Sequence, residues 1–419
     1  MTEPLYILIG YTTIWFLLFY IYYKKERTIG IAGVTLLFYG ASALTSIYFF
    51  ENSFTPITNI QIPPFLYIIA CILICLWPFI KNAQEMKSIG VAHYEDNNKI
   101  IYLFLLISAP LLIWATMELT YTAFHTDISA LVDIYEDRQE MKAKLSKVGH
   151  ICVGYMRQFD LIWPILFFYC VSKAGRYKKL AYVAVLGTIC MCLDGYIGAS
   201  RAAIVRQIIY FICVYFMCKN TLSESFIKRI TIFGGSILVI VILFLLAITI
   251  SRYSSGSGSV DILTWISLYS GEGVLRFSEH IWDLDQLSYG DTNFSFIKSC
   301  LGLDTFTVNE MRREYYAMKF NIPTHIFYTY IGDITMDFGK PFTIVFFLII
   351  SYMINSIIKK SIKRGYYTYT SLYWLSVYTL MIFYGIMYFF CKTYLTEMRV
   401  FIDFILIYTM QKFLYRPVE

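Results

Sequence analysis

Two arginines interrupt an otherwise apolar part of this sequence. Arg201 and Arg206 lie in "GYIGASRAAIVRQ", between the apolar runs "KLAYVAVLGTICMCLD" and "IIYFICVYFMC". An ionised side chain at the centre of a lipid bilayer costs about 2.5 to 3.5 kcal/mol on insertion scales, so it needs a partner, water or a task there. A guanidinium group is permanently charged and donates to two phosphate oxygens at once. Recognition of a phosphate group at a membrane is therefore the chemistry that these residues suit best.

The apolar runs around these arginines indicate membrane-spanning helices. Hydrophobic residues make up 58% of the 419 residues and charged residues 15%, and the mean hydropathy of +0.58 exceeds that of a normal soluble protein. About 20 apolar residues cross roughly 30 Å of hydrocarbon as a helix. The sequence predicts an all-α polytopic membrane protein with eleven transmembrane helices, over 5–23, 30–50, 62–80, 100–124, 152–172, 180–198, 203–218, 230–250, 341–358, 367–391 and 396–415.

Lysine and arginine mark the side on which each connecting segment lies. The first basic cluster, "KKER" at 24–27, follows the first run. This segment and every second connecting segment after it lie on one side of the membrane, and the short segments on that side carry an excess of Lys and Arg. Short cytoplasmic loops carry such an excess. We therefore expect the N-terminus outside and the C-terminus inside. Eight helices then occupy 1–250, one large outer loop occupies 251–340, and three helices occupy 341–419.

The large outer loop contains two short helical patterns. In "GVLRFSEHIWDL" an apolar stripe faces a polar one, which predicts an amphipathic helix lying on the bilayer. The apolar stripe is Val274, Phe277, Ile281 and Leu284, and the polar stripe is Arg276, Glu279, His280 and Asp283. A second helix begins at "TVNE", where Thr307 and Glu310 match a capping box. That both helices merely cover the bundle remains an alternative.

In this orientation the ionisable residues within the apolar runs and at their ends gather in the outer leaflet. They are Glu118, Arg157, Asp160, Asp194, Arg201, Arg206, Arg252, Lys392, Glu397, Arg399 and Asp403. The cytoplasmic halves of the same runs hold almost no charge, which argues against an ion path across the membrane. We expect a polar site at the outer leaflet. A simpler alternative covers part of the pattern, since Arg157 and Asp160 are three apart and could pair along one helix.

No cofactor, metal or nucleic acid is expected. Most of the ten cysteines fall within apolar runs, where they act as small hydrophobic residues. No cysteine pair has zinc-ligand spacing with nearby histidines. The net charge of +6 reflects basic loops that meet anionic lipid headgroups.

Two motifs resemble a known family. "GASRAAIV" at 198–205, on a tight outer turn, is similar to the Ser-Arg motif of bacterial O-antigen polymerases and of the related O-antigen ligases. "THIFYTYIGDITMDFGKPF" at 324–342, after the large loop, resembles their second signature. The resemblance covers about residues 180–360 and implies a multi-pass enzyme of the bacterial inner membrane whose site faces the periplasm. It implies a polymerase that joins polyprenyl-diphosphate-linked oligosaccharide units into surface polysaccharide, such as O-antigen of lipopolysaccharide or capsule.

The resemblance also implies roles for single residues. Arg201 matches the Ser-Arg arginine and is expected to stabilise the departing diphosphate. Other residues expected to bind the lipid diphosphate or the glycan are Arg157, Arg206, Arg252, Arg276, Tyr328 and Tyr330. His325 matches the position of a functional histidine in the ligases. Candidates for a base that assists deprotonation of the acceptor are His325, Glu279 and Asp333.

The expected partners are the lipid-linked oligosaccharide, as donor and as acceptor, membrane lipid, and a chain-length regulator protein. Several alternatives stay open. They are an O-antigen ligase, a flippase of lipid-linked oligosaccharides, a glycosyltransferase that uses a polyprenyl-monophosphate sugar, and a structural membrane component. The one-sided charge disfavours a flippase, which needs charge at several depths. The first outer loop, "ENSFTPITNIQ", has Glu51 alone, which disfavours the metal-linked monophosphate class.

Overall fold

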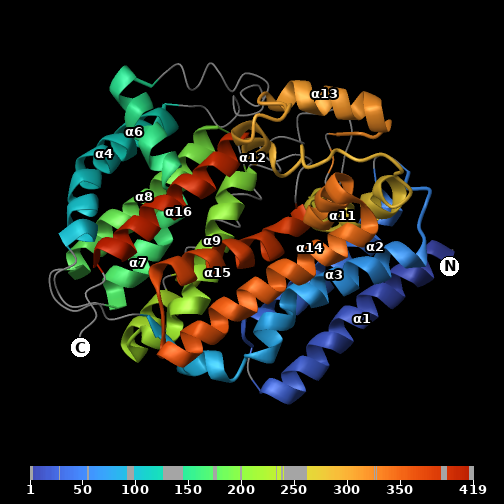
Figure 1. The fold of residues 1–419 in the computed structure, drawn as a ribbon, viewed down its shortest axis with the longest axis horizontal. Helices are drawn as coiled ribbons and strands as arrows, with labels where there is room; N and C mark the ends of the chain where they lie inside the picture. The colour runs from blue at the N-terminus through green and yellow to red at the C-terminus, as the bar shows by residue number, and fades with distance from the viewer. Residues whose placement is uncertain are drawn as a thin grey trace. The chain divides into compact units, whose positions relative to one another are not determined.

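Helices dominate the computed structural model of this chain (Figure 1). It describes residues 3–27, 29–53, 56–91, 99–125, 145–172, 177–198, 201–232, 234–236, 239, 262–324, 326, 328–387 and 394–414. Within these residues the only strands are β1 (Gly90–Val91) and β2 (Tyr366–Tyr367), which pair in parallel. The predicted all-α class is confirmed.

Most of the described helices lie along the apolar runs of the sequence, and others lie within the predicted outer loop. Their bounds are α1 Glu3–Glu26, α2 Ile31–Asn52, α3 Ile62–Lys81, α4 Lys99–Phe124, α6 Lys147–Gln158, α7 Ile162–Ser172, α8 Tyr177–Ile197, α9 Arg201–Cys218, α11 Ile262–Arg276, α12 Ser295–Cys300, α13 Asn309–Phe320, α14 Thr329–Arg364, α15 Tyr369–Tyr384 and α16 Tyr394–Leu414. Short 3-10 turns cover η1 Glu85–Ser88, η4 Lys219–Thr221 and η6 Gly385–Met387, and η5 Phe277–Ile281 is a π-helix.

Seven of these helices are long and apolar enough to span a membrane. The bent pair α6 and α7 adds an eighth if it crosses as one span. The chain is therefore a multi-pass membrane protein by the length and composition of its helices. The eleven-helix count and the orientation stay predictions, and most of the predicted run 230–250 lies outside the described residues.

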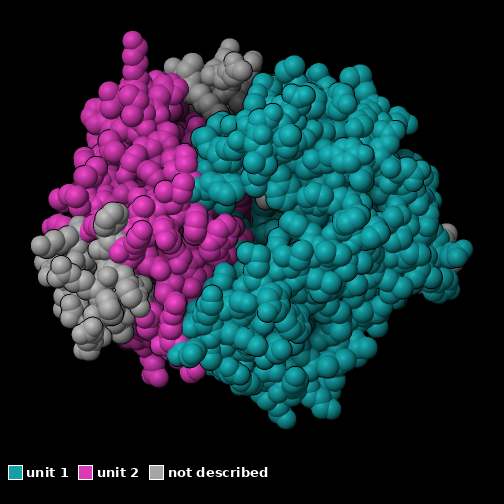
Figure 2. All heavy atoms as spheres, viewed as in Figure 1, with its two compact units in different colours: residues 1–87, 261–363, 378–401 teal, residues 88–260, 364–377, 402–419 magenta. Residues whose placement is uncertain are grey.

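The chain forms two compact units, coloured separately in Figure 2. Unit 1 comprises residues 1–87, 261–363 and 378–401, and unit 2 comprises residues 88–260, 364–377 and 402–419. Unit 1 therefore holds α1 to α3 and α11 to α13 with nearly all of α14. Unit 2 holds α4 and α6 to α9, and the two units divide α15 and α16.

The segment predicted as a helix over "GVLRFSEHIWDL" is buried in unit 1 on its apolar face and on part of its polar face, whereas Asp283 is exposed. Val274, Phe277 and Ile281 are buried, as their apolar stripe predicts. The expected exposed polar face is wrong at Arg276, which is only 4% exposed. Arg276 can be buried because the carboxylates on either side of it neutralise its charge.

The second predicted loop helix is confirmed as α13. The expected capping box is wrong, because the residue before the helix is Val308 and no side chain caps the first turn. The helix ends at Asn321, which has a left-handed φ of 53°. Asparagine tolerates this conformation better than most residues, so it terminates the helix cleanly.

Residues 329–342 of the second signature motif form the first turns of α14. The 36 residues of α14 would span about 54 Å as one straight helix, well beyond the thickness of a bilayer. It bends at Gly339, where φ is 77° and ψ is 164°. Only glycine adopts that conformation readily, so the "DFG" sequence places the bend. The part before the bend is almost entirely buried in unit 1.

Helix α11 packs closely along α2 within unit 1. Ser270 Oγ donates to Thr45 Oγ1 at 2.8 Å. A Cβ at Gly271 would lie 2.6 Å from the backbone nitrogen of Ser46. The atoms that this Cβ would meet belong to the α2 backbone, which cannot move aside as a flexible side chain could. The close packing of α11 on α2 therefore requires glycine at this position.

Gly271→Ala is expected to lower the free energy of unfolding by about 1 to 3 kcal/mol, the usual cost of overpacking. Gly10→Ala is the matched control, because a Cβ at Gly10 meets nothing within 4 Å. Alanine at this helical position is expected to stabilise by about 0.5 to 1 kcal/mol. Thermal unfolding of the purified protein in detergent measures both. Equal midpoints for the two variants would contradict the close α2–α11 contact.

Candidate functional site

The Ser-Arg turn connects two helices of unit 2, as the sequence predicts. Helix α8 ends at Ile197 and α9 begins at Arg201. Gly198 N donates to the carbonyl oxygen of Asp194 at 3.0 Å, which closes the last turn of α8. Residues 199–200 and the side chain of Arg201 lie outside the described part of the chain. The position of Arg201 is thus known only as the first residue of α9.

Two ion pairs connect helices around this turn. Arg157, near the end of α6, is bidentate on Asp194 of α8, with Nε donating to Oδ2 at 2.6 Å and Nη2 bonded to Oδ1. Arg206, one turn into α9, pairs through Nη2 with Oδ2 of Asp160. Both arginine side chains stay 25% exposed, whereas Asp194 is 16% and Asp160 2% exposed. Each arginine is therefore held by a carboxylate yet reachable from outside.

The alternative that Arg157 pairs with Asp160 along one helix is wrong. The helix breaks between Gln158 and Ile162, and α6 and α7 meet at 72°. Pro164 explains the break, because a proline ring clashes with the carbonyl four residues earlier, here that of Asp160. The break turns Asp160 toward α9. Gln207 Nε2 donates to its carbonyl oxygen at 3.3 Å.

In unit 1 a second polar cluster forms around the π-helical turn after α11. Arg276 lies between Glu272 at 3.4 Å and Glu279 at 2.5 Å. Glu279 also accepts hydrogen bonds from the backbone nitrogen of Thr58 at 3.0 Å and from its hydroxyl at 3.3 Å. His280 Nε2 lies 3.3 Å from Glu279 Oε2. The Glu279 carboxylate thus joins the π-helical turn after α11 to the segment between α2 and α3.

Burial and the neighbouring groups both act on the pKa values of Glu279 and His280. Burial acts to raise the pKa of Glu279, but the hydrogen bonds from Thr58 and Arg276 outweigh it and leave that pKa below its usual value. Burial lowers the pKa of His280; Glu279 acts to raise it and Arg276 lowers it further. Glu279 is therefore ionised and His280 neutral at neutral pH.

Three other candidates from the second motif lie at the start of α14. Asp333 is 0% exposed and Tyr330 2% exposed. Tyr328 is buried and donates to the carbonyl oxygen of Pro323 at 2.7 Å. The structure thus places Asp333 and both tyrosines inside unit 1, and their roles toward a substrate stay predictions. His325 and Arg252 lie outside the described residues.

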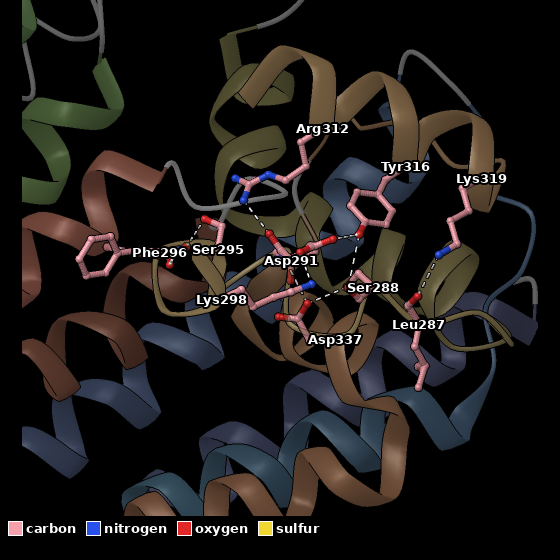
Figure 3. A network of polar contacts seen from close by, with 12 residues as sticks. Leu287, Ser288, Asp291, Ser295, Phe296, Lys298, Arg312, Tyr316, Lys319 and Asp337 are labelled. Carbon is pink, nitrogen blue, oxygen red and sulfur yellow. Dashed lines mark hydrogen bonds and ion pairs between the residues drawn. The ribbon is translucent and has the colours of Figure 1, made fainter. Parts of the chain in front are cut away.

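A third network, which the sequence did not suggest, fixes the segment after the π-helix onto α14 (Figure 3). Asp337 accepts from Ser288 Oγ at 2.6 Å, from Thr292 N at 3.0 Å and from Asn293 Nδ2 at 2.9 Å. Asp291 in the same segment receives Tyr316 OH at 2.6 Å and Lys298 Nζ at 2.5 Å. Arg312 Nη1 donates to the carbonyl oxygen of Asp291 at 2.6 Å.

This network connects α12, α13 and α14 and is saturated with internal contacts. The hydrogen bonds to Asp337 and the bend at Gly339 shape this part of α14. The run "GDTNFS" could have indicated this network, because short polar side chains that follow a glycine favour a tight, hydrogen-bonded segment. The network is structural, and the ion pairs of unit 2 and the Glu279–His280 cluster are the candidate functional sites.

Among the residues that the structure describes, no group of three or more His, Cys, Asp or Glu side chains is arranged to hold a metal ion. The arginines, carboxylates and one histidine can bind an anion, orient a hydroxyl and move a proton. No protein-family model, curated protein sequence or solved structure matches this chain.

Proposed function

We propose that this protein polymerises oligosaccharide repeat units carried on a polyprenyl diphosphate, at the periplasmic face of a bacterial inner membrane. In this reaction a hydroxyl of the incoming lipid-linked unit attacks the anomeric carbon of the growing chain. The bond from that carbon to the diphosphate oxygen breaks, and the diphosphate leaves with the electron pair. Such a transfer inverts the anomeric centre and requires positive charge at the leaving group.

The observation that supports this proposal most is the start of α9. The first N–H groups of a helix lack intrahelical partners, and with the helix dipole they favour an anion. Arg201 is the first residue of this 18-residue helix. Arg157 is held beside the same turn, because Asp194 binds its guanidinium while the Asp194 carbonyl accepts from Gly198. Guanidinium groups at a helix N-terminus provide the donors that a diphosphate needs.

Arg201→Ala is expected to abolish long surface polysaccharide while leaving single repeat units on their acceptor, as gene deletion should. The reason is the loss of charge that stabilises the leaving diphosphate. Electrophoretic profiling of the surface glycan measures it, with immunoblotting of membranes to verify insertion. Arg229→Ala is the control, since Arg229 is exposed in the described structure and lies on the side predicted to face the cytoplasm. It should keep normal chain length.

The same experiment separates the other classes of function. Accumulation of polymer that is not attached to its acceptor would indicate a ligase, and loss of all surface glycan would indicate a flippase. Normal chain length in a membrane-inserted Arg201→Ala variant would contradict the proposed role of Arg201. Normal chain length in the deletion strain would contradict the proposed function itself.

A further inference from the structure

Two irregular pieces of backbone meet beside His280. Residues Phe277–Ile281 form a π-helical turn, closed by a hydrogen bond from Trp282 N to Phe277 O at 2.9 Å. π-helical turns are rare and frequent at functional sites. Thr329, at the start of α14, has a φ of 67°, which is a strained conformation for a β-branched residue. The rings of His280 and Tyr328, the residue before Thr329, lie 6.1 Å apart.

Strain of this kind persists only where the surrounding structure enforces it, and it clusters at functional sites. Here the enforcing contacts are visible. A Cβ at Gly273 would lie 3.1 Å from Thr329 Cγ2, so α11 and the start of α14 are in close contact. Thr329 Oγ1 also accepts from Gly332 N at 3.2 Å. The strained threonine thus packs directly against α11, the helix that continues into the π-helical turn.

His280 and Glu279 have the geometry of a base and the carboxylate that orients it. His280 Nε2 lies 3.3 Å from Glu279 Oε2. With Nε2–H directed at that oxygen, the lone pair is on Nδ1. Glu279 is itself fixed by Thr58 and by Arg276, so its position does not depend on the histidine. The His280 side chain keeps 23% of its surface exposed, against 9% for Glu279.

We propose that His280 accepts the proton of the attacking hydroxyl and that Glu279 is the positioning residue for its imidazole. This assignment rests on the proposed function. The hydroxyl proton moves to Nδ1 of His280 as the oxygen forms its bond to the anomeric carbon, and the carbon–oxygen bond to the diphosphate breaks. The imidazolium is stabilised by Glu279 and later returns its proton to water.

The other candidate bases that the structure describes fit this role less well. Asp333 is fully buried, and Glu279 is engaged by a guanidinium and two donors from Thr58. The charged or titratable groups that face His280 among the described residues are Glu279 and Arg276 on its own segment and Tyr328 from the start of α14. The segment between α2 and α3 contributes Thr58 to this cluster, and threonine does not titrate. Burial and Arg276 keep the imidazole neutral, as a base must be.

The test is in vitro polymerisation by the purified protein with its lipid-linked repeat unit, measured as single-turnover rate against pH. His280→Gln is expected to lower the maximal rate by about a hundred- to ten-thousand-fold, the usual contribution of a general base. The donor concentration at half-maximal rate should not change, and the acid limb of the profile should disappear. His150→Gln is the control, because His150 is an exposed histidine of α6 in unit 2.

Glu279→Gln separates a positioning role from a merely structural one. Glu279 acts to raise the pKa of His280, so its removal should move the acid limb to lower pH while the maximal rate falls. If His280→Gln fails to fold, diethyl pyrocarbonate labelling of wild-type His280 against pH replaces it. Labelling must then follow the same pH dependence as the rate.

Each contrary outcome points to a different error. A His280→Gln rate within twofold of wild type, with Arg201→Ala inactive, would overturn the base assignment and leave the polymerase standing. Full activity in both variants would overturn the roles of His280 and Arg201, whereas no polymerisation by the wild-type protein would contradict the proposed function. A rate that does not follow the labelling of His280 would also overturn the assignment.

Discussion

Asp160→Ala is expected to lower the free energy of unfolding by about 3 kcal/mol, at the low end of the range for breaking a buried ion pair. Asp160 is 2% exposed and holds Arg206 of α9. Removing the carboxylate leaves the guanidinium without its buried counter-ion in a helix of low polarity. The figure is not higher because the Arg206 side chain keeps 25% exposure and can rehydrate in part. Thermal unfolding in detergent measures the loss.

A double variant distinguishes the ion pair from the volume of the aspartate. Asp160→Asn with Arg206→Gln removes both charges and keeps two groups that can hydrogen-bond. It should be more stable than either single variant, because no unpaired charge remains. Glu224→Ala is the control, since Glu224 is exposed in unit 2, and its midpoint should match wild type. Strictly additive losses in the double variant would contradict a direct Asp160–Arg206 interaction.

The positions of the long helices could be predicted because length and apolarity alone determine them. The run 62–80 became α3 (Ile62–Lys81), and the run 180–198 became α8 (Tyr177–Ile197). In α3, prolines at the first helical positions add a start signal, since a missing N–H costs nothing there. Hydropathy does not depend on tertiary contacts, so these predictions needed no knowledge of neighbours.

The charged residues could be located from the sequence but their partners could not. The spacing of Arg157 and Asp160 suggested a pair, yet Pro164 breaks that helix and sends each residue to a different partner. Periodicity likewise treated Arg276 as exposed. Its neighbours Glu272 and Glu279, four residues before and three after, carried the signal that its charge is neutralised and could be buried.

The Glu279–His280 cluster could not be predicted from local sequence patterns, because its contacts join residues that are far apart in the chain. Glu279 meets Thr58, more than two hundred residues earlier in the chain. The π-helical turn at 277–281 and the positive φ of Thr329 arise from how α11 and α14 pack, not from residue preference. The sequence suggested Glu279 as a base by side-chain type and predicted side, and only the fold shows its contacts with Thr58, Arg276 and His280.

Asp337→Ala is expected to cost about 3 to 5 kcal/mol, because up to three buried donors would lose their acceptor at about 1 to 3 kcal/mol each. Those donors are Ser288, Thr292 and Asn293. Their release should free the segment that Asp291 connects to α13. Faster hydrogen exchange over 287–298, together with a lower unfolding midpoint, is the expected result.

The asparagine variant shows how the carboxylate acts. In Asp337→Asn one side-chain oxygen can still accept from Ser288 and Thr292, and rotation of the Asn293 amide can present its own oxygen to the new NH₂ group. We therefore expect Asp337→Asn to lose less stability than Asp337→Ala, with exchange confined to the neighbourhood of Asn293. Asp285→Ala, at an exposed position of the same segment, should leave both measurements unchanged. Equal losses for the alanine and asparagine variants would mean that the negative charge, and not the set of hydrogen bonds, holds this segment on α14.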